Sequence, residues 1–356
     1  MVEDGAHFEA AVLRALDARG APPIAEWAAA YEEQSARFTR DRDALEGPSG
    51  LLATRAQLAV AGLVFAARTF QIARRLLAAV PPRGGLTEIG AGWGPFGAAA
   101  ALLGVEPVRL IDRAPAPLAL AQRLFAELGA PRPEILVAEG STARRCGSVA
   151  IAYALNEMLV RRAPEDAVRD GAEMLRGWLS ELEPGGQVYV LEPGLKSTAR
   201  TLQAIRDRLA GTCEIVGPCT GRGPCPLLPR ARDWCHFRWP ISLGPVGQAV
   251  AQRAHRHHEE VNFSWLILRA GPAGEGEPMA RVLEVRRRTR ARVELTLCSD
   301  AGIQQVVALP RTPELRAVLA DIQPGSVARL DPEHCELRGD GLRLRDASGI
   351  ARLAPL

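Results

Sequence analysis

The feature that most constrains the fold of this 356-residue chain is a run of short apolar segments alternating with helical patterns between residues 86 and 195. Short strands separated by helical stretches are typical of a parallel sheet wrapped by helices. The predicted strands are LTEIG (86–90), PVRLID (107–112), EILVAE (134–139), SVAIAYAL (148–155) and QVYVLEP (187–193). Five such strands predict an α/β domain built on a doubly wound sheet.

The regions on either side of these strands follow different patterns. Residues 7–80 carry apolar side chains at three- and four-residue spacing, which predicts helices. The linker GPAGEGEP (271–278) precedes a segment that alternates apolar and polar residues between turns, which predicts a small β-rich appendage. We therefore expect an N-terminal helical region (1–80), an α/β domain (81–270) with a cysteine-rich loop (213–240), and a C-terminal β-rich domain (279–356).

The start of the sequence, MVEDGAHFEA, is acidic and lacks a basic segment followed by an apolar run. This pattern indicates no secretory signal and predicts a cytoplasmic location. Arginine interrupts the most apolar helical stretch, 51–80, at four positions, which a membrane span would not tolerate at its centre. These positions are Arg55, Arg68, Arg74 and Arg75. We expect no membrane partner, and a monomer when the protein is free.

A glycine-rich turn follows the first predicted strand in LTEIGAGWGPFG. Gly90, Gly92 and Gly94 allow the backbone to turn tightly and approach a ligand closely. Asp112 ends the next strand, where a carboxylate can accept hydrogen bonds from both hydroxyls of a ribose. Dinucleotide binding is the obvious alternative, but the segment EIGAGWG (88–94) lacks the GxGxxG spacing, and Trp93 is bulky where a pyrophosphate would need room. A tight turn without a ligand is the other alternative.

The turn resembles the first motif of S-adenosylmethionine-dependent methyltransferases, which have a Rossmann-like fold and carry this acid and these glycines. The resemblance implies that S-adenosylmethionine is a cofactor and that Glu139, at the end of the third strand, lies near its adenine. The cofactor-binding residues implied in this way are Glu88, Gly90, Ala91, Gly92, Gly94, Asp112 and Glu139.

The segment YALNEM (153–158) follows the fourth predicted strand, where such enzymes position the methyl acceptor. Asn156 and Glu157 are the catalytic candidates, because methyl transfer needs an oriented acceptor and, for some acceptors, removal of a proton. The alternative is that Asn156 caps a helix and Glu157 stabilises its first turn. The segment contains no cysteine and no NPPY-type loop, so the acceptor cannot be identified from it.

Three cysteines, Cys219, Cys225 and Cys235, lie within the loop GPCTGRGPCPLLPRARDWCHF (217–237). Disulfides are unusual in the cytosol, and buried free thiols normally lie on strands or helices, so a metal is the better explanation. The paired CxxC spacing of zinc sites is absent. A cluster bound by four thiolates would need a fourth cysteine, for which Cys298 and Cys213 are candidates.

Together these motifs resemble the methyltransferase-like small-ribosomal-subunit assembly factors of mitochondria and bacteria. The resemblance covers GAGWG, ALNEM, LEPG, GPC…GPCPL…DWCHF, NFSWLILR and VELTLCSDAG in this order, over roughly residues 50–310. It implies a 4Fe–4S cluster on Cys219, Cys225, Cys235 and Cys298, with zinc as the alternative metal. By this comparison Cys213, Cys146 and Cys335 are structural or incidental thiols. The resemblance also implies association with the small subunit during its assembly.

The segment RVLEVRRRTRARVELTL (281–297) is the densest basic run of a chain whose formal net charge is +3. It predicts either a nucleic-acid face or a solvated, charged edge strand. With the resemblance, we expect it to contact ribosomal RNA through Arg286, Arg287, Arg288, Arg290 and Arg292. Three functions remain open: an rRNA methyltransferase, a non-catalytic RNA-binding assembly factor with this fold, and a zinc-stabilised small-molecule methyltransferase.

Overall fold

The computed structural model describes residues 2–18, 20–39, 54–138, 147–256, 259–272, 279–338 and 341–354. The chain divides into two compact units. Unit 1 comprises Met1–Pro193 and Arg238–Phe263, and unit 2 comprises Gly194–Phe237 and Ser264–Leu356.

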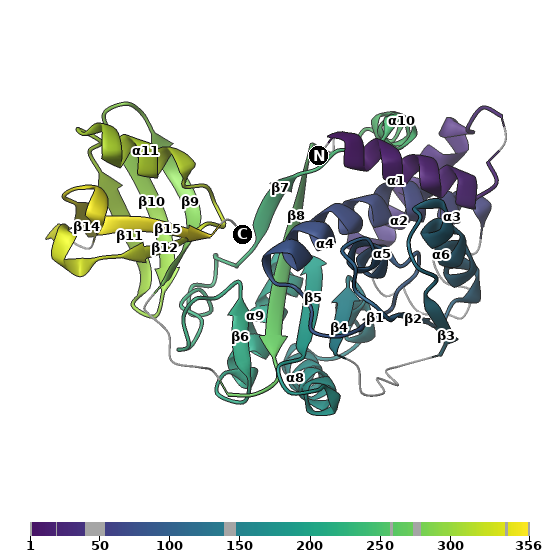
Figure 1. Cartoon of the computed structure of the whole chain (residues 1–356), viewed down its shortest axis with the longest axis horizontal. Helices are drawn as coiled ribbons and strands as arrows, with labels where there is room; N and C mark the ends of the chain where they lie inside the picture. Colours follow the sequence, from purple (N-terminus) through teal and green to yellow (C-terminus); the bar gives the residue numbers. More distant parts are fainter. Residues whose placement is uncertain are drawn as a thin grey trace. The chain divides into compact units, whose positions relative to one another are not determined.

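Unit 1 is built on five parallel strands, in which β1 lies between β2 and β4 (Figure 1). Their order across the sheet is β3 (Glu134–Val137), β2 (Val108–Asp112), β1 (Leu86–Ile89), β4 (Ser148–Ala152) and β5 (Gln187–Pro193). Leu86 is in register with Val108 on one side and Ser148 on the other. The chain therefore reverses its direction of winding beside β1, and in open α/β sheets ligands bind at this point, beyond the carboxyl ends of the strands.

Helices connect these strands: α5 (Pro95–Ala101), α6 (Pro115–Glu127), α7 (Leu155–Met158) and α8 (Pro164–Glu181). Proline opens α5, α6 and α8, at a position where its missing N–H costs no helical hydrogen bond. The four alanines of α5 are buried, so this helix packs closely against its neighbours. The connections give unit 1 the alternating strand and helix order that the sequence predicts.

The N-terminal part of unit 1 is helical, with α1 (Val2–Ala15), α2 (Ile24–Thr39) and a long helix formed by α3 (Arg55–Val60), the π-helical segment η2 (Ala61–Ala66) and α4 (Ala67–Ala79). The long helix, Arg55–Ala79, is apolar enough to cross a membrane by length and composition, but 78% of its most apolar window is buried inside the protein. This burial is typical of a core helix. Unit 1 also contains α10 (Pro245–Arg253).

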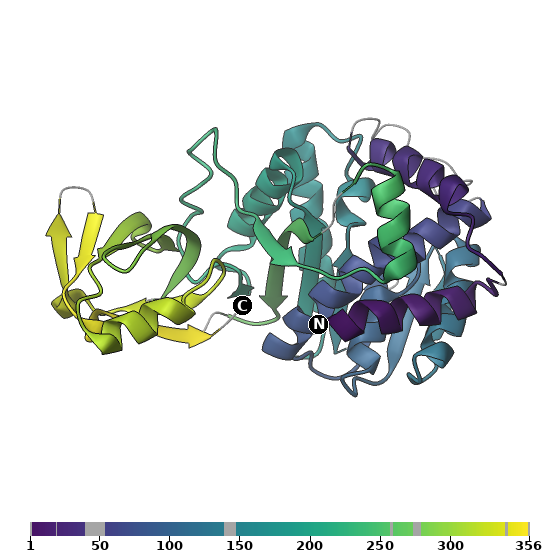
Figure 2. The ribbon, with the colours of Figure 1, turned by 90° about the horizontal axis from the view of Figure 1, so that it is seen from above.

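Unit 2 begins with α9 (Lys196–Leu209) and β6 (Glu214–Gly217), which pairs antiparallel with the end of β8 (Glu260–Arg269). Its C-terminal part is a curled seven-stranded sheet with α11 (Pro313–Asp321) beside it (Figure 2). The sheet order is β13 (Cys335–Arg338), β14 (Gly341–Leu344), β11 (Gly302–Ala308), β10 (Val293–Ser299), β9 (Ala280–Arg288), β12 (Val327–Leu330) and β15 (Ile350–Ala354). Val282, Leu295 and Leu297 lie at the centre of its apolar core.

The predicted fold class is confirmed: an α/β, Rossmann-like domain with an N-terminal helical region and a C-terminal β-rich part. The five predicted strands form, each within a few residues of its expected bounds. The helix α10 ends at Arg253, two residues before His255, which takes a left-handed backbone conformation with φ 52°. The three domain boundaries proposed from the sequence remain a prediction.

Candidate cofactor turn and thiol pocket

The turn after β1 places three glycines in the left-handed region, with φ of 65° at Gly90, 52° at Gly92 and 67° at Gly94. Glycine is the residue that adopts this conformation without a steric penalty. A Cβ atom on Gly90 would also lie only 2.4 Å from Cβ of Ala154, at the end of β4. The glycines therefore allow the turn to fold closely over the carboxyl ends of β1 and β4.

Asp112, at the end of β2, holds this turn in place. Its Oδ2 accepts a hydrogen bond from the Gly92 N–H at 2.8 Å, and its Oδ1 accepts one from the Ala114 N–H at 2.8 Å. Each carboxylate oxygen can accept a further hydrogen bond. Asp112 is therefore a fixed acceptor beside the glycine turn, where its remaining lone pairs could bind a diol.

Glu88 lies beneath the turn and is only 1% exposed. Its two oxygens accept hydrogen bonds from the N–H groups of Phe96 (3.2 Å) and Gly97 (2.7 Å) at the start of α5. Burial raises the pKa of this carboxyl to about 8, while the two backbone donors oppose the rise. Glu88 thus joins β1 to α5. Glu139, the other acid assigned to the cofactor, lies outside the described residues.

Trp93 packs against the long N-terminal helix and is 2% exposed. Its Nε1 donates to the Leu58 carbonyl at 3.0 Å. The indole lies over Gly62 in the π-helical segment, where a Cβ would be 3.0 Å from two atoms of the ring. The indole of Trp93, which the sequence analysis treated as an obstacle to a ligand, is therefore packed against this helix.

A polar cluster lies where β4 and β5 end. The Nδ2 of Asn156 donates to the Tyr153 carbonyl at 2.7 Å, and the Asn156 N–H donates to Oε1 of Glu192 at 3.1 Å. Glu192 is 2% exposed, and Glu157, in the same short helix as Asn156, is half-buried. Tyr153 has φ 62°, which is costly for a residue with a side chain, and burial raises the pKa of its hydroxyl. Strained residues of this kind cluster at functional sites.

Sequence analysis did not single out Tyr153 or Glu192. Both belong to segments quoted there, YALNEM and LEPG: Tyr153 directly follows β4, and Glu192 lies near the end of the neighbouring strand β5. Their position at the carboxyl ends of neighbouring parallel strands was the available signal.

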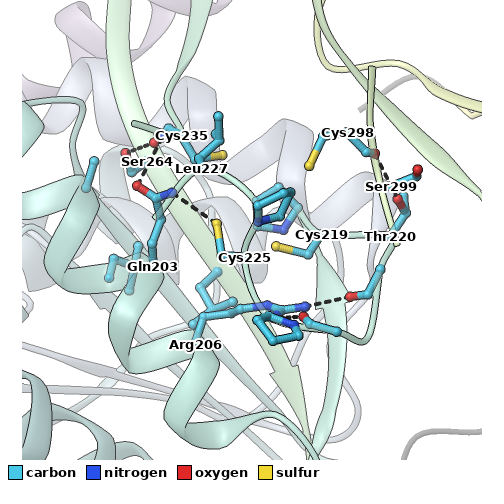
Figure 3. Close-up of a pocket in the computed structure, with 18 of the residues that line it drawn as sticks. Gln203, Arg206, Cys219, Thr220, Cys225, Leu227, Cys235, Ser264, Cys298 and Ser299 are labelled. Atoms are coloured by element: carbon cyan, nitrogen blue, oxygen red, sulfur yellow. Dashed lines mark hydrogen bonds between the residues drawn. The ribbon is translucent and has the colours of Figure 1, made fainter. Parts of the chain in front are cut away.

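Unit 2 brings four cysteines to one pocket (Figure 3). Cys219, Cys225 and Cys235 come from the loop 218–236, which we call the thiol loop, and Cys298 comes from β10. The pocket has a volume of about 50 Å³, whereas a single water molecule needs roughly 10–15 Å³. Cys213, the alternative fourth cysteine, does not line this pocket. Its Sγ lies 3.7 Å from the Leu209 carbonyl.

Side chains of α9 hold the thiol loop in its conformation. Gln203 donates from Nε2 to the Cys225 Sγ at 3.1 Å and accepts on Oε1 from the Cys235 N–H at 3.2 Å (Figure 3). Both oxygens of Asp207 accept from the Cys225 N–H, at 3.0 and 2.9 Å. These residues have the i, i+4 spacing of one helix face. That face, in KSTARTLQAIRDRL, was the signal that the sequence analysis missed.

The turn between β10 and β11 also holds the thiol loop. Oδ1 of Asp300 accepts from the N–H groups of Arg222 (2.6 Å) and Gly223 (3.0 Å). Thr220 Oγ1 donates to the Met279 carbonyl at 2.9 Å. The same hydroxyl lies 3.5 Å from the Cys298 carbonyl, so protein atoms bond the loop to β10 and to the turn that follows it.

Burial raises the pKa of the thiols of Cys219, Cys235 and Cys298, to about 12 for Cys298, and neighbouring thiols add to the rise. Arg206 and Arg281 act in the opposite direction for Cys219 and Cys298. Within the described ranges, no three His, Cys, Asp or Glu side chains are close enough together to coordinate a single metal ion. The four thiols surround a space and do not converge on a point.

The arginine run on β9 and the following turn divides into two kinds of residue. The guanidinium of Arg288 donates to the carbonyls of Ala320 and Ile322, and Arg292 pairs with Glu294 at 2.6 Å. All five arginines are exposed. Arg286 has only longer contacts, to Gln305 at 3.4 Å and to Glu284 at 4.0 Å. Arg288 and Arg292 thus have the closer bonds within the protein, and Arg286, Arg287 and Arg290 are the better candidates for a contact at the surface.

A sequence profile of the family described as "Mitochondrial small ribosomal subunit Rsm22" matches residues 82–312, more than half of the chain. The chain belongs to the Rsm22 family. The predicted resemblance to a small-ribosomal-subunit family is therefore confirmed, and the protein is a ribosome-related, methyltransferase-like protein. No curated protein matches the chain.

Membership of the Rsm22 family corrects one expectation. The predicted cytoplasmic location is wrong, because the family is described as mitochondrial. The prediction relied on the lack of a secretory pattern at the start of the sequence, and that lack does not exclude import of the protein into an organelle.

Solved structures similar to this Rsm22-family chain include a putative RNA methyltransferase from Pyrococcus horikoshii, 11% identical, with a TM-score of 0.35 over 60% of this chain and 84% of that one. Another is the N-methyltransferase NodS from Bradyrhizobium japonicum in complex with S-adenosyl-l-homocysteine, 13% identical, with a TM-score of 0.37 over 68% and 98%. These chains are too distant to indicate what the present protein binds.

Proposed function

We propose that this protein binds S-adenosylmethionine at the turn after β1, holds a 4Fe–4S cluster in the thiol pocket, and acts on the small ribosomal subunit or its rRNA during assembly. The observation that carries the cofactor proposal is Asp112, fixed by the Gly92 N–H beside three left-handed glycines at the carboxyl end of the sheet. A carboxylate in this position can accept hydrogen bonds from both hydroxyls of a ribose.

The thiol pocket fits an iron–sulfur cluster better than a single zinc ion. Zinc holds thiolates at about 2.3 Å from one point, and the described residues form no such group. In a cluster with four thiolate ligands, each thiolate binds at the surface of a larger inorganic core. A cavity of about 50 Å³ lined by four cysteines matches the second arrangement. A cluster there would join the thiol loop to β10 within unit 2.

Contact with rRNA is proposed through the exposed arginines Arg286, Arg287 and Arg290. Guanidinium groups bind phosphate, which would give an affinity that falls with salt. Arg288 and Arg292 were proposed with them, and their bonds within the protein leave them fewer free donors.

Cofactor binding is tested by calorimetry with S-adenosylmethionine on wild type, Asp112→Ala and Arg109→Ala. Loss of hydrogen bonds to a charged acceptor, worth about 1.5–3 kcal/mol each, should weaken binding at least tenfold in Asp112→Ala. Arg109 lies on the same strand and pairs with Glu134 at the surface, so its variant serves as the control. Equal affinities for all three proteins would refute the assignment.

Methyl transfer is a second candidate function, favoured by the strained Tyr153 beside Asn156 and Glu192. When bound, S-adenosylmethionine supplies a methyl group on a sulfonium, and the protein must orient the acceptor. Transfer of radiolabelled methyl to small-subunit rRNA, lost in Asn156→Ala with cofactor affinity unchanged, would support an enzyme. Absence of transfer by wild type that binds both cofactor and rRNA would leave a non-catalytic assembly factor.

The metal is tested by anaerobic purification with iron, sulfide and zinc analysis of wild type and Cys298→Ser. Iron and sulfide in wild type, lost in the variant, are the expected result. Stoichiometric zinc without iron would instead favour the zinc-stabilised small-molecule methyltransferase.

A further inference from the structure

Two buried arginines lie at the thiol pocket. Arg206, on α9, lines it with a side chain that is 4% exposed. Arg281, on β9, is also 4% exposed, and its charge interacts with the thiols of Cys219, Cys235 and Cys298. Burying one cation requires compensation, and burying two beside one cavity requires more.

Protein groups compensate these charges only in part. Arg206 pairs with Asp207 at 2.8 Å. Arg281 donates to the carbonyls of Pro218 (2.8 Å) and Gly325 (2.6 Å) and lies 5.8 Å from the ring centroid of Trp265. In the part of the chain that the structure describes, no carboxylate pairs with Arg281. Arg281 is therefore buried beside the pocket without a carboxylate partner among the described residues, and Asp300, which also lines the pocket, instead accepts from the N–H groups of Arg222 and Gly223.

The pocket groups that interact with the charge of Arg281 are the thiols of Cys219, Cys235 and Cys298. A thiol is neutral, and the thiolate is the form that binds a metal. A group held by four thiolates is anionic and would satisfy both arginines.

Two buried donors support the same conclusion. Nε of Arg206 and Nε1 of Trp265, which also lines the pocket, have no hydrogen-bond acceptor among the described residues. Sulfur atoms accept hydrogen bonds, and hydrogen bonds to the sulfurs are one of the ways in which proteins adjust the reduction potential of a cluster.

We propose that Arg206 and Arg281 are the counter-charges of an anionic group bound by Cys219, Cys225, Cys235 and Cys298, and that they set its retention and its reduction potential. This inference rests on the proposed cluster. It makes both arginines positioning residues. The guanidinium of Arg206 holds the carbonyls of Gly221 and Gly223 in the thiol loop.

Arg281 has a further consequence because its two hydrogen bonds end on different segments. Pro218 lies at the start of the thiol loop, and Gly325 lies two residues before β12, a strand of the C-terminal sheet. The positive charge that would balance the bound anionic group is therefore on Arg281, the same side chain that connects the thiol loop to this sheet. Loss of the group would leave that side chain buried without its counter-charge and weaken the connection.

The experiment compares wild type with Arg281→Met, Arg206→Met and the charge-conserving variants Arg281→Lys and Arg206→Lys. Arg287→Met, an exposed arginine on the same strand β9, is the matched control. Each protein is reconstituted anaerobically with iron and sulfide. Three quantities are then measured: the rate of iron loss to a chelator, the midpoint potential in a titration with dithionite, and the rise in Tm of each loaded protein over its own apoprotein.

We expect both Met variants to lose iron at least tenfold faster than wild type and to gain less Tm on loading. Reduction adds an electron to an already anionic group, so removing a nearby cation should make the midpoint potential more negative. The Lys variants should recover most of the potential, and Arg287→Met should match wild type. Comparing each protein with its own apoprotein separates this effect from a general loss of stability.

Two results would overturn the inference in distinguishable ways. If wild type loads iron and sulfide and the Met variants retain both with an unchanged potential, the arginines are not counter-charges and the cluster proposal stands. If wild type takes up neither iron nor sulfide, the cluster proposal fails and this inference fails with it.

Discussion

Glu88→Gln isolates one buried carboxyl whose protonation should control how the stability of unit 1 depends on pH. Burial raises the pKa of Glu88 from 4.5 to about 8. Between these values the folded protein keeps the proton and the unfolded chain releases it. Because the unfolded state then binds fewer protons, the free energy of unfolding falls as pH rises.

The magnitude follows from the same two pKa values. The slope should be roughly 1.4 kcal/mol for each pH unit across the interval from 4.5 to about 8. The full loss would be of the order of 4–5 kcal/mol, which is a large part of the stability of a typical domain. Below pH 4.5 the carboxyl is protonated in both states, and above pH 8 it is ionised in both, so the contribution becomes constant.

The assay is urea unfolding of wild type and Glu88→Gln at several pH values between 4.5 and 8. Glutamine has one acceptor oxygen for the two N–H donors of Phe96 and Gly97, which lowers stability equally at every pH. Only the difference in slope between the two proteins reports the carboxyl. Glu134→Gln, which changes a 56% exposed carboxyl on β3, should leave the slope close to that of wild type.

Parallel stability curves for wild type and Glu88→Gln would refute the reasoning. They would mean that the two backbone donors at the start of α5 outweigh the burial of the carboxyl and keep Glu88 ionised throughout.

Three further predictions concern other parts of the chain. Trp93→Ala should lower the free energy of unfolding by about 3–5 kcal/mol, measured with urea, and a loss below about 1 kcal/mol would contradict the buried packing of the indole. Asp300→Ala removes the acceptor of two thiol-loop N–H groups and should cost about 1–3 kcal/mol, whereas an unchanged urea midpoint would show that this turn does not hold the loop. Arg287→Ala should weaken rRNA binding, measured by fluorescence anisotropy, and reduce the salt dependence of the affinity by about one at unchanged Tm. Arg288→Ala should instead lower Tm, measured by thermal unfolding. A lower Tm for Arg287→Ala with unchanged rRNA binding would contradict this division.

The sheet of unit 1 could be predicted because its central strands β1, β4 and β5 are buried on both faces and therefore form continuous apolar runs. Val149, Ala150 and Ile151 of β4 are 0% exposed, and their run stands out from the helical patterns beside it. The glycine turn could be predicted because left-handed backbone restricts residue choice. The end of α10 could not be predicted in this way, since His255 takes a left-handed conformation without being a glycine.

The residues that surround the thiol pocket were harder to predict from the sequence. The cysteine spacing and the family resemblance indicated the four thiols, but nothing indicated Gln203, Arg206 or Arg281 as their neighbours. Polar residues on a helix or strand usually face solvent, so a sequence pattern assigns them to the surface. Their burial depends on contacts between segments far apart in the chain, such as the bond from Arg281 to Gly325.

The packing of Trp93 over Gly62 has an evolutionary consequence. A Cβ at position 62 would lie 2.7 Å from Cγ1 of Val12 and 3.0 Å from two atoms of the indole, so both neighbours would have to shift. A large residue at position 93 therefore favours glycine at position 62, and a smaller residue at position 93 removes part of that restriction. Among relatives of this chain the two positions should vary together, so that the identity of a residue in the N-terminal helix can be inferred from one in the glycine turn after β1.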